Sequence, residues 1–339
     1  MALRSTARRL LFTSVASSAV ATTVRGFSVA GPHCTFRSAP VAAQRVDSRQ
    51  SVHFSMMADT EGGADNKKEG LFLFDFDGVV CDSCDECTVS ALRACQQLGV
   101  LTSSETKTVD YQYPPPWLFQ KMREIRPAIE VGWQIPVLLS VFLEQHDRPD
   151  AMSVHEIIEN YKVLVEDWLN KWGKTERDMV DAFGGVRDAW IADDLNSWLD
   201  INTFYPGIPE ALLNCEGESI LATTKQQRFA IALCRHAGVS TEALPDERIY
   251  GLGMYQKKGD VICDRMAAGG YAPDETRFFE DRWPTLAKCL QDDRLDGVHF
   301  YLCAWGYVTE GELQLAHEEP RVQVLHLDDF PKIVAPRQG

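Results

Sequence analysis

The segment from residue 71 to residue 80 begins as an apolar run and then contains two acidic residues. It reads Leu71-Phe-Leu-Phe-Asp75-Phe-Asp77-Gly78-Val-Val80, so a Leu/Phe segment is followed by two aspartates one residue apart and a glycine. Aspartate is a poor strand former and is costly to bury, so the pattern predicts a buried strand that carries two carboxylates to its tip. Active sites open at this end of the strands in parallel α/β sheets. A strand followed by an ordinary Asp-Gly turn would give the same spacing.

The pattern after this strand predicts a run of helices and then an alternation of strands and helices. Helical spacing covers residues 88–98, 117–144, 153–172 and 176–199. Strand-like segments follow at 220–222, 248–250, 278–280, 299–303 and 322–327, with helical segments such as 229–236 and 259–266 between them. This alternation predicts an α/β fold with a Rossmann-like, doubly wound parallel sheet and right-handed crossovers.

The helical stretch interrupts the sheet pattern and therefore reads as an inserted, all-helical domain. We expect a core made of residues 71–81 and 204–335 and a helical cap insertion at 82–203, which would close over the site and select the substrate. A Gly-rich, charged linker precedes the core at 59–70.

Residues 1–58 have the composition of an organelle transit peptide. They contain seven Arg, no Lys and a single acidic residue, Asp47, giving +7 − 1 = +6 against −15 for the whole chain and leaving −21 for the remainder. Their Ser, Thr and Ala content favours a plastid, whereas Arg8–Phe12 could form the amphipathic helix of a mitochondrial presequence. A start at Met56 or Met57 would instead leave a cytosolic form.

Composition limits the partners. No run approaches the ~18 apolar residues of a membrane span. The acidic remainder argues against nonspecific binding to nucleic acid or to anionic membranes, so any attraction for phosphate must be local. The sequence contains no indication of the oligomeric state.

Four segments resemble, in order, the motifs of the haloacid dehalogenase superfamily. They are Phe74-Asp75-Phe-Asp77-Gly78-Val-Val80, then Ser219-Ile-Leu-Ala-Thr223-Thr224-Lys225, then Lys257 ahead of a helical pattern, and finally Phe278-Phe-Glu280-Asp281-Arg282. The resemblance spans residues 70 to 335. Uncharacterised plant and cyanobacterial members are similar at four further runs: Phe204–Gly207, Ala222–Phe229, Glu280–Leu286 and Trp305–Tyr307.

The residues themselves suggest phosphoryl transfer. Asp75 can attack phosphorus and form an aspartyl phosphate, and Asp77 can protonate the leaving oxygen and then deprotonate water. Lys257 would neutralise phosphate charge, and Thr223 would donate a hydrogen bond to a phosphoryl oxygen. The resemblance assigns the same four roles. It also implies that an Asp at position 77 favours phosphate esters, because cleavage of a carbon–halogen bond needs no leaving-group acid.

A carboxylate that attacks a phosphate dianion requires a cation, and Mg²⁺ suits an all-oxygen site. The expected ligands are the Asp75 carboxylate, the Asp77 carbonyl and Asp281. Many members of the superfamily carry another acidic residue about four positions after the metal-binding Asp, where this chain has Thr285. We expect the adjacent pair Glu280-Asp281 to substitute for it, with Glu280 either binding the ion directly or contacting a residue that does.

Three further choices are open at this point. Lys257 and Lys258 are neighbours, and the spacing from Gly251 favours Lys257. For the substrate we expect contacts from four residues: Gly78, Thr224, Lys225 and Arg126. Cys81, Cys84 and Cys87 read either as three ligands of a zinc or iron–sulfur site or as apolar residues of a capped helix start.

The function predicted is a Mg²⁺-dependent phosphatase acting on a small phosphorylated metabolite. A phosphomutase or phosphotransferase would use the same aspartyl phosphate but would need a cap that excludes water. A non-catalytic binding protein with this fold is the third reading, and the chemically competent side chains at all five catalytic positions count against it.

Overall fold

The computed structural model describes residues 68–101, 110, 113–146 and 148–335. The predicted transit peptide at 1–58 and most of the linker at 59–70 lie outside these residues. The described residues fall within one compact unit, Gly63–Gly339.

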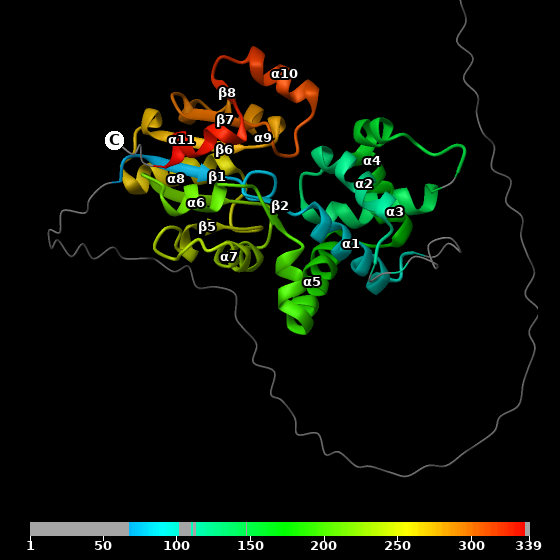
Figure 1. Ribbon diagram of the computed structural model, residues 1–339. Coiled ribbons are helices and arrows are strands. Elements are labelled where there is room, and N and C mark those ends of the chain that lie inside the picture. The colour runs from blue at the N-terminus through cyan, green and yellow to red at the C-terminus, as the bar shows by residue number, and fades with distance from the viewer. Residues whose placement is uncertain (1–67, 102–109, 111–112, 147, 336–339) are drawn as a thin grey trace, which may run out of the picture. The chain divides into compact units, whose positions relative to one another are not determined.

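A six-stranded parallel sheet forms the core, in the order β5-β4-β1-β6-β7-β8 (Figure 1). The strands are β1 Leu71–Phe74, β4 Glu218–Ala222, β5 Ile249–Tyr250, β6 Thr276–Glu280, β7 His299–Cys303 and β8 Val322–Leu325. The chain builds β4 and β5 on one side of β1 and then returns to place β6, β7 and β8 on the other side. The predicted α/β class and parallel sheet are confirmed, and β1 lies where the winding direction reverses, which is the usual place for a site in such sheets.

Strand β1 is buried on both faces because helices cover both sides of the sheet. Its side chains alternate, as the two-residue period of a strand requires: Phe72 and Phe74 join one apolar cluster, while Leu71 and Leu73 join the other. Phe74 stacks on Phe279 of the neighbouring strand, with ring centroids 5.0 Å apart. These contacts keep β1 and β6 in register along their whole length, so that their carboxyl ends lie side by side.

Helices of the core connect the strands. They are α6 Ile208–Leu213, α7 Gln227–His236, α8 Lys258–Gly269, α9 Trp283–Cys289, α10 Glu310–Glu318 and α11 Phe330–Val334. Among the described residues, no helix combines the length and the apolar character needed to cross a bilayer.

The predicted helical insertion is present between two short strands, β2 Cys81–Asp82 and β3 Thr203–Phe204, which pair antiparallel. Its helices are α1 Cys84–Leu98, α2 Pro116–Ile125, α3 Ile135–Gln145, α4 Val154–Trp172 and α5 Glu176–Asp200. We call residues 84–200 the helical insertion. It has an apolar cluster of its own, in which α1 packs against α2, α3 and α5. The pairing of β2 with β3 means that the chain leaves and re-enters the core at one place.

The prediction of one continuous helix over residues 117–144 was wrong. The structure has two helices, α2 and α3, separated by two short 3-10 turns, Arg126–Ala128 and Gly132–Gln134. Pro127 lacks the backbone N–H that a continuing helix needs, and the chain turns to extended geometry at Ile129. The break places Arg126 at the end of α2 instead of on a helix face.

Candidate active site

Asp75 and Asp77 follow the end of β1, as the sequence predicts. The backbone N–H of Asp75 still donates to Phe279 O of β6 at 2.9 Å, which fixes Asp75 beside Glu280. Asp77 lies in the turn that follows, where Gly78 N–H donates to Cys81 O. Gly78 has φ +94°, and a Cβ on it would lie 1.8 Å from Asp281 Oδ2. Only glycine fits this turn, because both the left-handed backbone and the adjacent carboxylate exclude a side chain.

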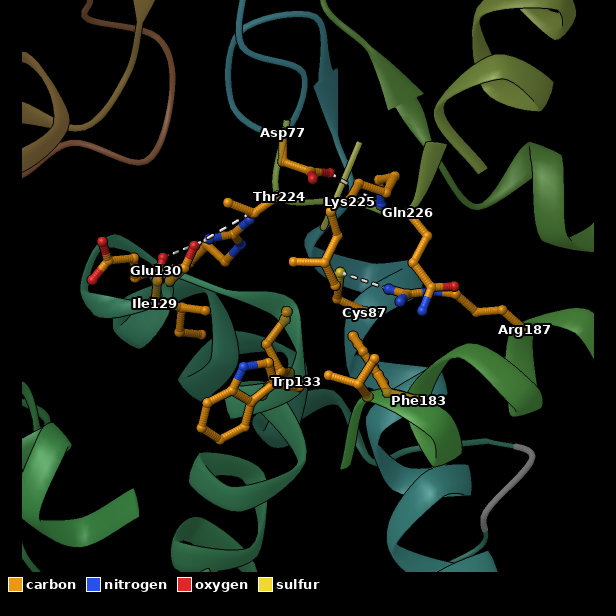
Figure 2. Close-up of a pocket in the computed structure, with 15 residues that line it drawn as sticks. Asp77, Cys87, Ile129, Glu130, Trp133, Phe183, Arg187, Thr224, Lys225 and Gln226 are labelled. Carbon is orange, nitrogen blue, oxygen red and sulfur yellow. Dashed lines mark hydrogen bonds and ion pairs between the residues drawn. The ribbon is translucent and has the colours of Figure 1, made fainter. Parts of the chain in front are cut away.

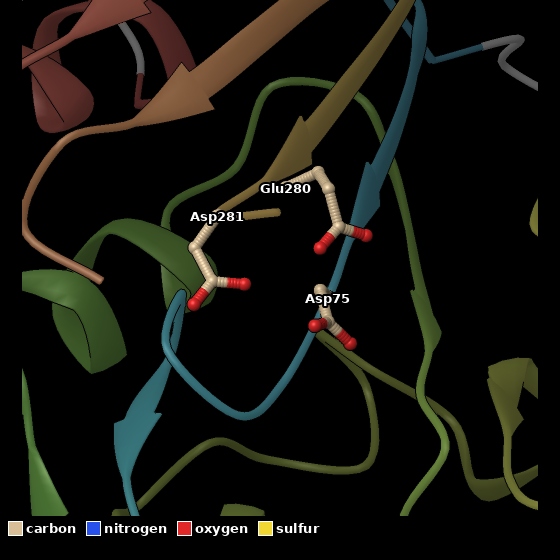
Figure 3. A group of neighbouring side chains, drawn as sticks. All are labelled: Asp75, Glu280 and Asp281. Atoms are coloured by element: carbon tan, nitrogen blue, oxygen red, sulfur yellow. The ribbon is translucent and has the colours of Figure 1, made fainter. Parts of the chain in front are cut away.

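Three buried carboxylates meet at the tips of β1 and β6: Asp75, Glu280 and Asp281 (Figure 3). Each offers an oxygen, and these oxygens lie within 4.8 Å of one another. Asp281 Oδ2 accepts from Tyr307 N–H at 2.7 Å, but Asp281 Oδ1 has no hydrogen-bond partner among the described residues. Burial, reinforced by Glu280 and Asp75, raises the pKa of Asp281 well above its ordinary value. A hard divalent cation would relieve the repulsion among the carboxylates and give Asp281 Oδ1 a partner, so the residues fit an ion of the Mg²⁺ type.

Lys258, and not Lys257, is the lysine of this cluster. Lys258 Nζ lies 2.8 Å from Asp75 Oδ1 and 2.8 Å from Glu280 Oε2, with its side chain only 9% exposed. Lys257 is the exposed N-cap residue of α8; it lines the adjacent cavity, but among the described residues it forms no ion pair with these carboxylates. The preference for Lys257 drawn from the sequence is therefore reversed: the start of α8 sets which of two adjacent lysines faces inward.

The charges around Asp75 oppose one another. Burial raises the pKa of Asp75 to about 7, against the lowering effect of Lys258, while Glu280 and Asp77 push it up further. For Lys258, burial alone would lower the pKa, but Asp75 and Glu280 outweigh it and raise the pKa above its ordinary value. The lysine therefore stays charged, and an added cation would favour the ionised form of Asp75.

Asp77 has a different environment from Asp75, although only one residue separates them. Ser83 Oγ donates to Asp77 Oδ1, and Lys225 Nζ lies 3.1 Å from the same oxygen. Burial would raise the pKa of Asp77, but Lys225, Arg126 and the Ser83 hydroxyl together lower it. Two carboxylates with oppositely shifted pKa values are the arrangement expected when neighbouring acids have different chemical tasks.

Lys225 belongs to a buried ionic network that the sequence did not reveal. Its ammonium group lies 3.8 Å from Glu86 Oε2, and Glu86 in turn forms two short hydrogen bonds with Arg187, of 2.7 and 2.9 Å. Glu86 is on α1 and Arg187 on α5, so the network ties the helical insertion to the loop after β4. Nothing in the spacing distinguishes Glu86 from its neighbour Asp85, which is why it was missed.

The two threonines after β4 have separate surroundings. Thr223 is buried, and its Oγ1 accepts from Lys225 N–H at 3.0 Å, which helps to shape the loop. Thr224 Oγ1 donates to Glu130 O of the helical insertion at 3.3 Å and lines the cavities described next. Thr223 does not line them.

Two cavities open beside these side chains. The larger, of about 740 Å³, is lined by Asp75, Asp77, Lys258, Glu280 and Arg282 among others. The smaller, of about 40 Å³, lies under the helical insertion and is drawn in Figure 2. Five residues line both cavities: Asp77, Arg126, Ile129, Glu130 and Thr224. Asp75 and Glu280 therefore line a cavity that shares five wall residues with a narrow compartment beside the insertion.

The thiols of the C-x-x-C-x-x-C run do not form a metal site. Cys81, Cys84 and Cys87 are buried, and burial raises the pKa of each thiol. Among the described residues, the three strand-tip carboxylates are the one group of potential ligands close enough to hold an ion. Asp82 Oδ1 accepts from Cys84 N–H at 3.0 Å, which supports the alternative of a capped helix start.

No protein-family model and no curated protein matches the chain. Several solved structures are similar to it. A structure described as a predicted phosphatase from Clostridium acetobutylicum is 17% identical, covering 79% of this chain and 98% of its own, with a TM-score of 0.46. A predicted phosphoglycolate phosphatase from Haemophilus somnus is 15% identical, covering 80% and 98%, with a TM-score of 0.48. A haloacid dehalogenase-like hydrolase from Streptococcus pneumoniae is 13% identical, covering 75% and 92%, with a TM-score of 0.39. At these values we argue function from the chain's own side chains.

Proposed function

We propose that the chain is a Mg²⁺-dependent phosphatase of the haloacid dehalogenase type, which hydrolyses a small phosphate monoester through an aspartyl phosphate on Asp75. The observation that carries the proposal is the cluster at the tips of β1 and β6. There Asp75 lies against Lys258 and two further carboxylates, with Asp77 following in the next turn. A nucleophile, a separate acid/base and a compact source of positive charge are what phosphoryl transfer requires.

In the first step an Asp75 carboxylate oxygen attacks the phosphorus atom. The new P–O bond forms as the ester P–O bond breaks, and the leaving oxygen takes a proton from Asp77. In the second step the Asp77 carboxylate removes a proton from a water molecule, whose oxygen attacks the same phosphorus. This attack releases inorganic phosphate and restores the Asp75 carboxylate.

The charged neighbours have defined tasks in both steps. Lys258 offsets negative charge on Asp75 and Glu280 and leaves less repulsion for an incoming phosphate. Lys225 and Ser83 stabilise Asp77 as a carboxylate, the form that acts as the base in the second step. The proton that Asp77 takes from water in that step is the one it gives to the leaving oxygen in the next turnover. The residues that would hold Mg²⁺ are Asp75, Asp281 and the Asp77 carbonyl, with Glu280 alongside, and the ion would supply the positive charge that lets a carboxylate approach a phosphate dianion.

Phosphate release from a panel of esters tests the proposal. The full-length protein would be given sugar phosphates, phosphorylated acids, nucleotides and p-nitrophenyl phosphate, with Mg²⁺ or with EDTA. We expect turnover only with Mg²⁺ and a loss of at least about a thousandfold in Asp75→Asn. Asp264→Asn, an exposed change on α8, is the matched control and keeps full activity.

Two results would redirect the proposal. Turnover that survives in Asp75→Asn would exclude Asp75 as the nucleophile. Phosphate transfer to an added alcohol, without release to water, would favour a phosphotransferase. Import of residues 1–58 into a plastid stays a separate prediction, tested by locating the full-length protein fused to a fluorescent tag.

A further inference from the structure

The segment Trp305–Tyr307, which follows β7, packs against the turn after β1. Trp305 Nε1 donates to Val79 O of that turn at 3.1 Å. Gly306 lies so close to the turn that a Cβ on it would come 2.3 Å from Gly78 O, so the approach requires glycine. The phosphatase chemistry proposed above gives these three residues no task.

Tyr307 contacts both sides of the site through different atoms. Its backbone N–H donates to Asp281 Oδ2 at 2.7 Å, on the side of the expected metal ligands. Its hydroxyl donates to Asp82 Oδ1 at 2.8 Å and accepts from Ser83 N–H at 3.0 Å. An ionised carboxylate can only accept, so Asp82 takes the hydroxyl proton and a lone pair of the Tyr307 oxygen is left for Ser83. Tyr307 is 8% exposed and Ser83 is fully buried, so the hydroxyl fixes the Ser83 backbone away from bulk water.

Ser83 has an unusual role for a residue that precedes a helix. It is the N-cap residue of α1, where a serine hydroxyl ordinarily accepts from a backbone N–H of the first turn. Here the Ser83 side chain makes no capping hydrogen bond, and Asp82 accepts from Cys84 N–H instead. The Ser83 hydroxyl donates to Asp77 Oδ1. A local preference that is given up beside reacting groups indicates a functional role for the contact that replaces it.

The contacts of the Asp77 carboxylate fall on one of its two oxygens. Ser83 Oγ and Lys225 Nζ, the latter at 3.1 Å, both approach Oδ1. These two contacts restrict rotation of the carboxylate and leave Oδ2 for proton transfer. A general acid must lie within hydrogen-bond reach of the oxygen that it protonates, so the orientation of this group affects the rate.

We propose that Tyr307 is a positioning residue for the acid/base Asp77. Its hydroxyl fixes the Ser83 backbone, and the Ser83 hydroxyl fixes Asp77 Oδ1, so that Oδ2 gives its proton to the leaving oxygen and later takes one from water. Tyr307 acts through Ser83 and touches neither the substrate nor the transferred phosphate. The inference rests on the phosphatase function proposed above.

Tyr307→Phe tests the role with two esters that differ in their leaving group. The change removes the hydroxyl and keeps the ring and the backbone N–H that binds Asp281. We expect kcat/KM to fall by about tenfold for an alkyl phosphate and to stay within about twofold for p-nitrophenyl phosphate. The reason is that kcat/KM covers the steps up to loss of the leaving group, and nitrophenolate leaves without an acid. The affinity for Mg²⁺, measured by calorimetry, should stay within about twofold. An equal loss on both esters would overturn the inference, since a general disturbance of the site would not distinguish them.

Two variants complete the test. Tyr271→Phe also removes a buried tyrosine hydroxyl that donates to a carboxylate, but its partner Glu218 is the first residue of β4, at the end of the sheet opposite the site. This control should stay within about twofold on both esters. Ser83→Ala should give the same dependence on the leaving group as Tyr307→Phe, and the double variant should be no slower than Ser83→Ala alone. Two losses that multiply in the double variant would contradict action through Ser83.

Unfolding separates failure of this inference from failure of the phosphatase proposal. Urea unfolding of the wild type, Tyr307→Phe, Ser83→Ala and the double variant needs no substrate. Losses of unfolding free energy that are less than additive support the link between Tyr307 and Ser83 even if no ester is hydrolysed, in which case only the phosphatase proposal fails. Additive losses would refute the link, whatever the enzyme's activity.

Discussion

Glu86→Gln tests the buried ionic network most sharply. Glu86 is fully buried and holds Arg187 through two hydrogen bonds of 2.7 and 2.9 Å, with Ser90, Trp198 and Lys225 around the same carboxylate. Glutamine keeps the shape but removes the charge, which leaves the buried Arg187 without its counter-ion. Breaking a buried pair on one side costs about 3–5 kcal/mol.

The shifted pKa of Glu86 gives a similar value for the stability that the buried pair contributes. Burial would raise this pKa, but Arg187 and Lys225 lower it from 4.5 to about 2. That difference corresponds to about 3 kcal/mol of stability at neutral pH. The sign follows from the lowered folded-state pKa: the contribution is present above pH 4.5 and is lost as the pH falls through 4.5 towards 2. Acid should therefore destabilise the wild-type protein more than Glu86→Gln over this window.

Urea unfolding at neutral pH measures the change, and Asp188→Asn is the matched control. Asp188 also binds an arginine, Arg228, through two hydrogen bonds of 2.9 and 2.7 Å, but the two side chains are 50% and 53% exposed. We expect a loss of about 3 kcal/mol for Glu86→Gln and at most about 1 kcal/mol for Asp188→Asn. Equal losses in the two variants would refute the reasoning that burial makes the Glu86 pair decisive.

Three further predictions concern the strand tips. Lys258→Ala should lower kcat by about a hundredfold or more, whereas Lys257→Ala should stay within about twofold, and steady-state kinetics on one ester compares them. Asp77→Asn should slow alkyl esters by about a hundredfold or more but p-nitrophenyl phosphate far less, because a good leaving group needs no acid; equal losses on both would contradict the acid role. Gly78→Ala should destabilise the fold by about 2 kcal/mol or more and weaken Mg²⁺ binding, since its Cβ would displace Asp281; unfolding and calorimetry measure the two effects, and unchanged values would contradict this geometry.

The sequence predicted the sheet and the strand tips well because both follow from local rules. A Leu/Phe run that ends in Asp75, and the pair Phe278-Phe279 that precedes Glu280, mark strands whose carboxyl ends must meet once the sheet is parallel. The α/β class needed only the alternation of strand and helix periods along the chain.

The errors have equally physical causes. The choice between Lys257 and Lys258 depends on where α8 begins, and a shift of one residue turns a helical side chain by about 100°. The sequence predicted no break at Pro127, because the apolar helical spacing continues on both sides of it. Glu86 could not be predicted, because its partner Arg187 lies 101 residues away and only the packing of α1 on α5 brings them together.

Trapping the covalent intermediate tests the central claim most directly. The full-length protein would be mixed with Mg²⁺ and a turned-over ester, quenched with hydroxylamine, which converts an aspartyl phosphate to a hydroxamate, and mapped by peptide mass spectrometry. We predict a hydroxamate at Asp75 that forms only when the ester is present. Turnover of the ester with no modification at Asp75, or with modification at another carboxylate, would contradict Asp75 as the nucleophile.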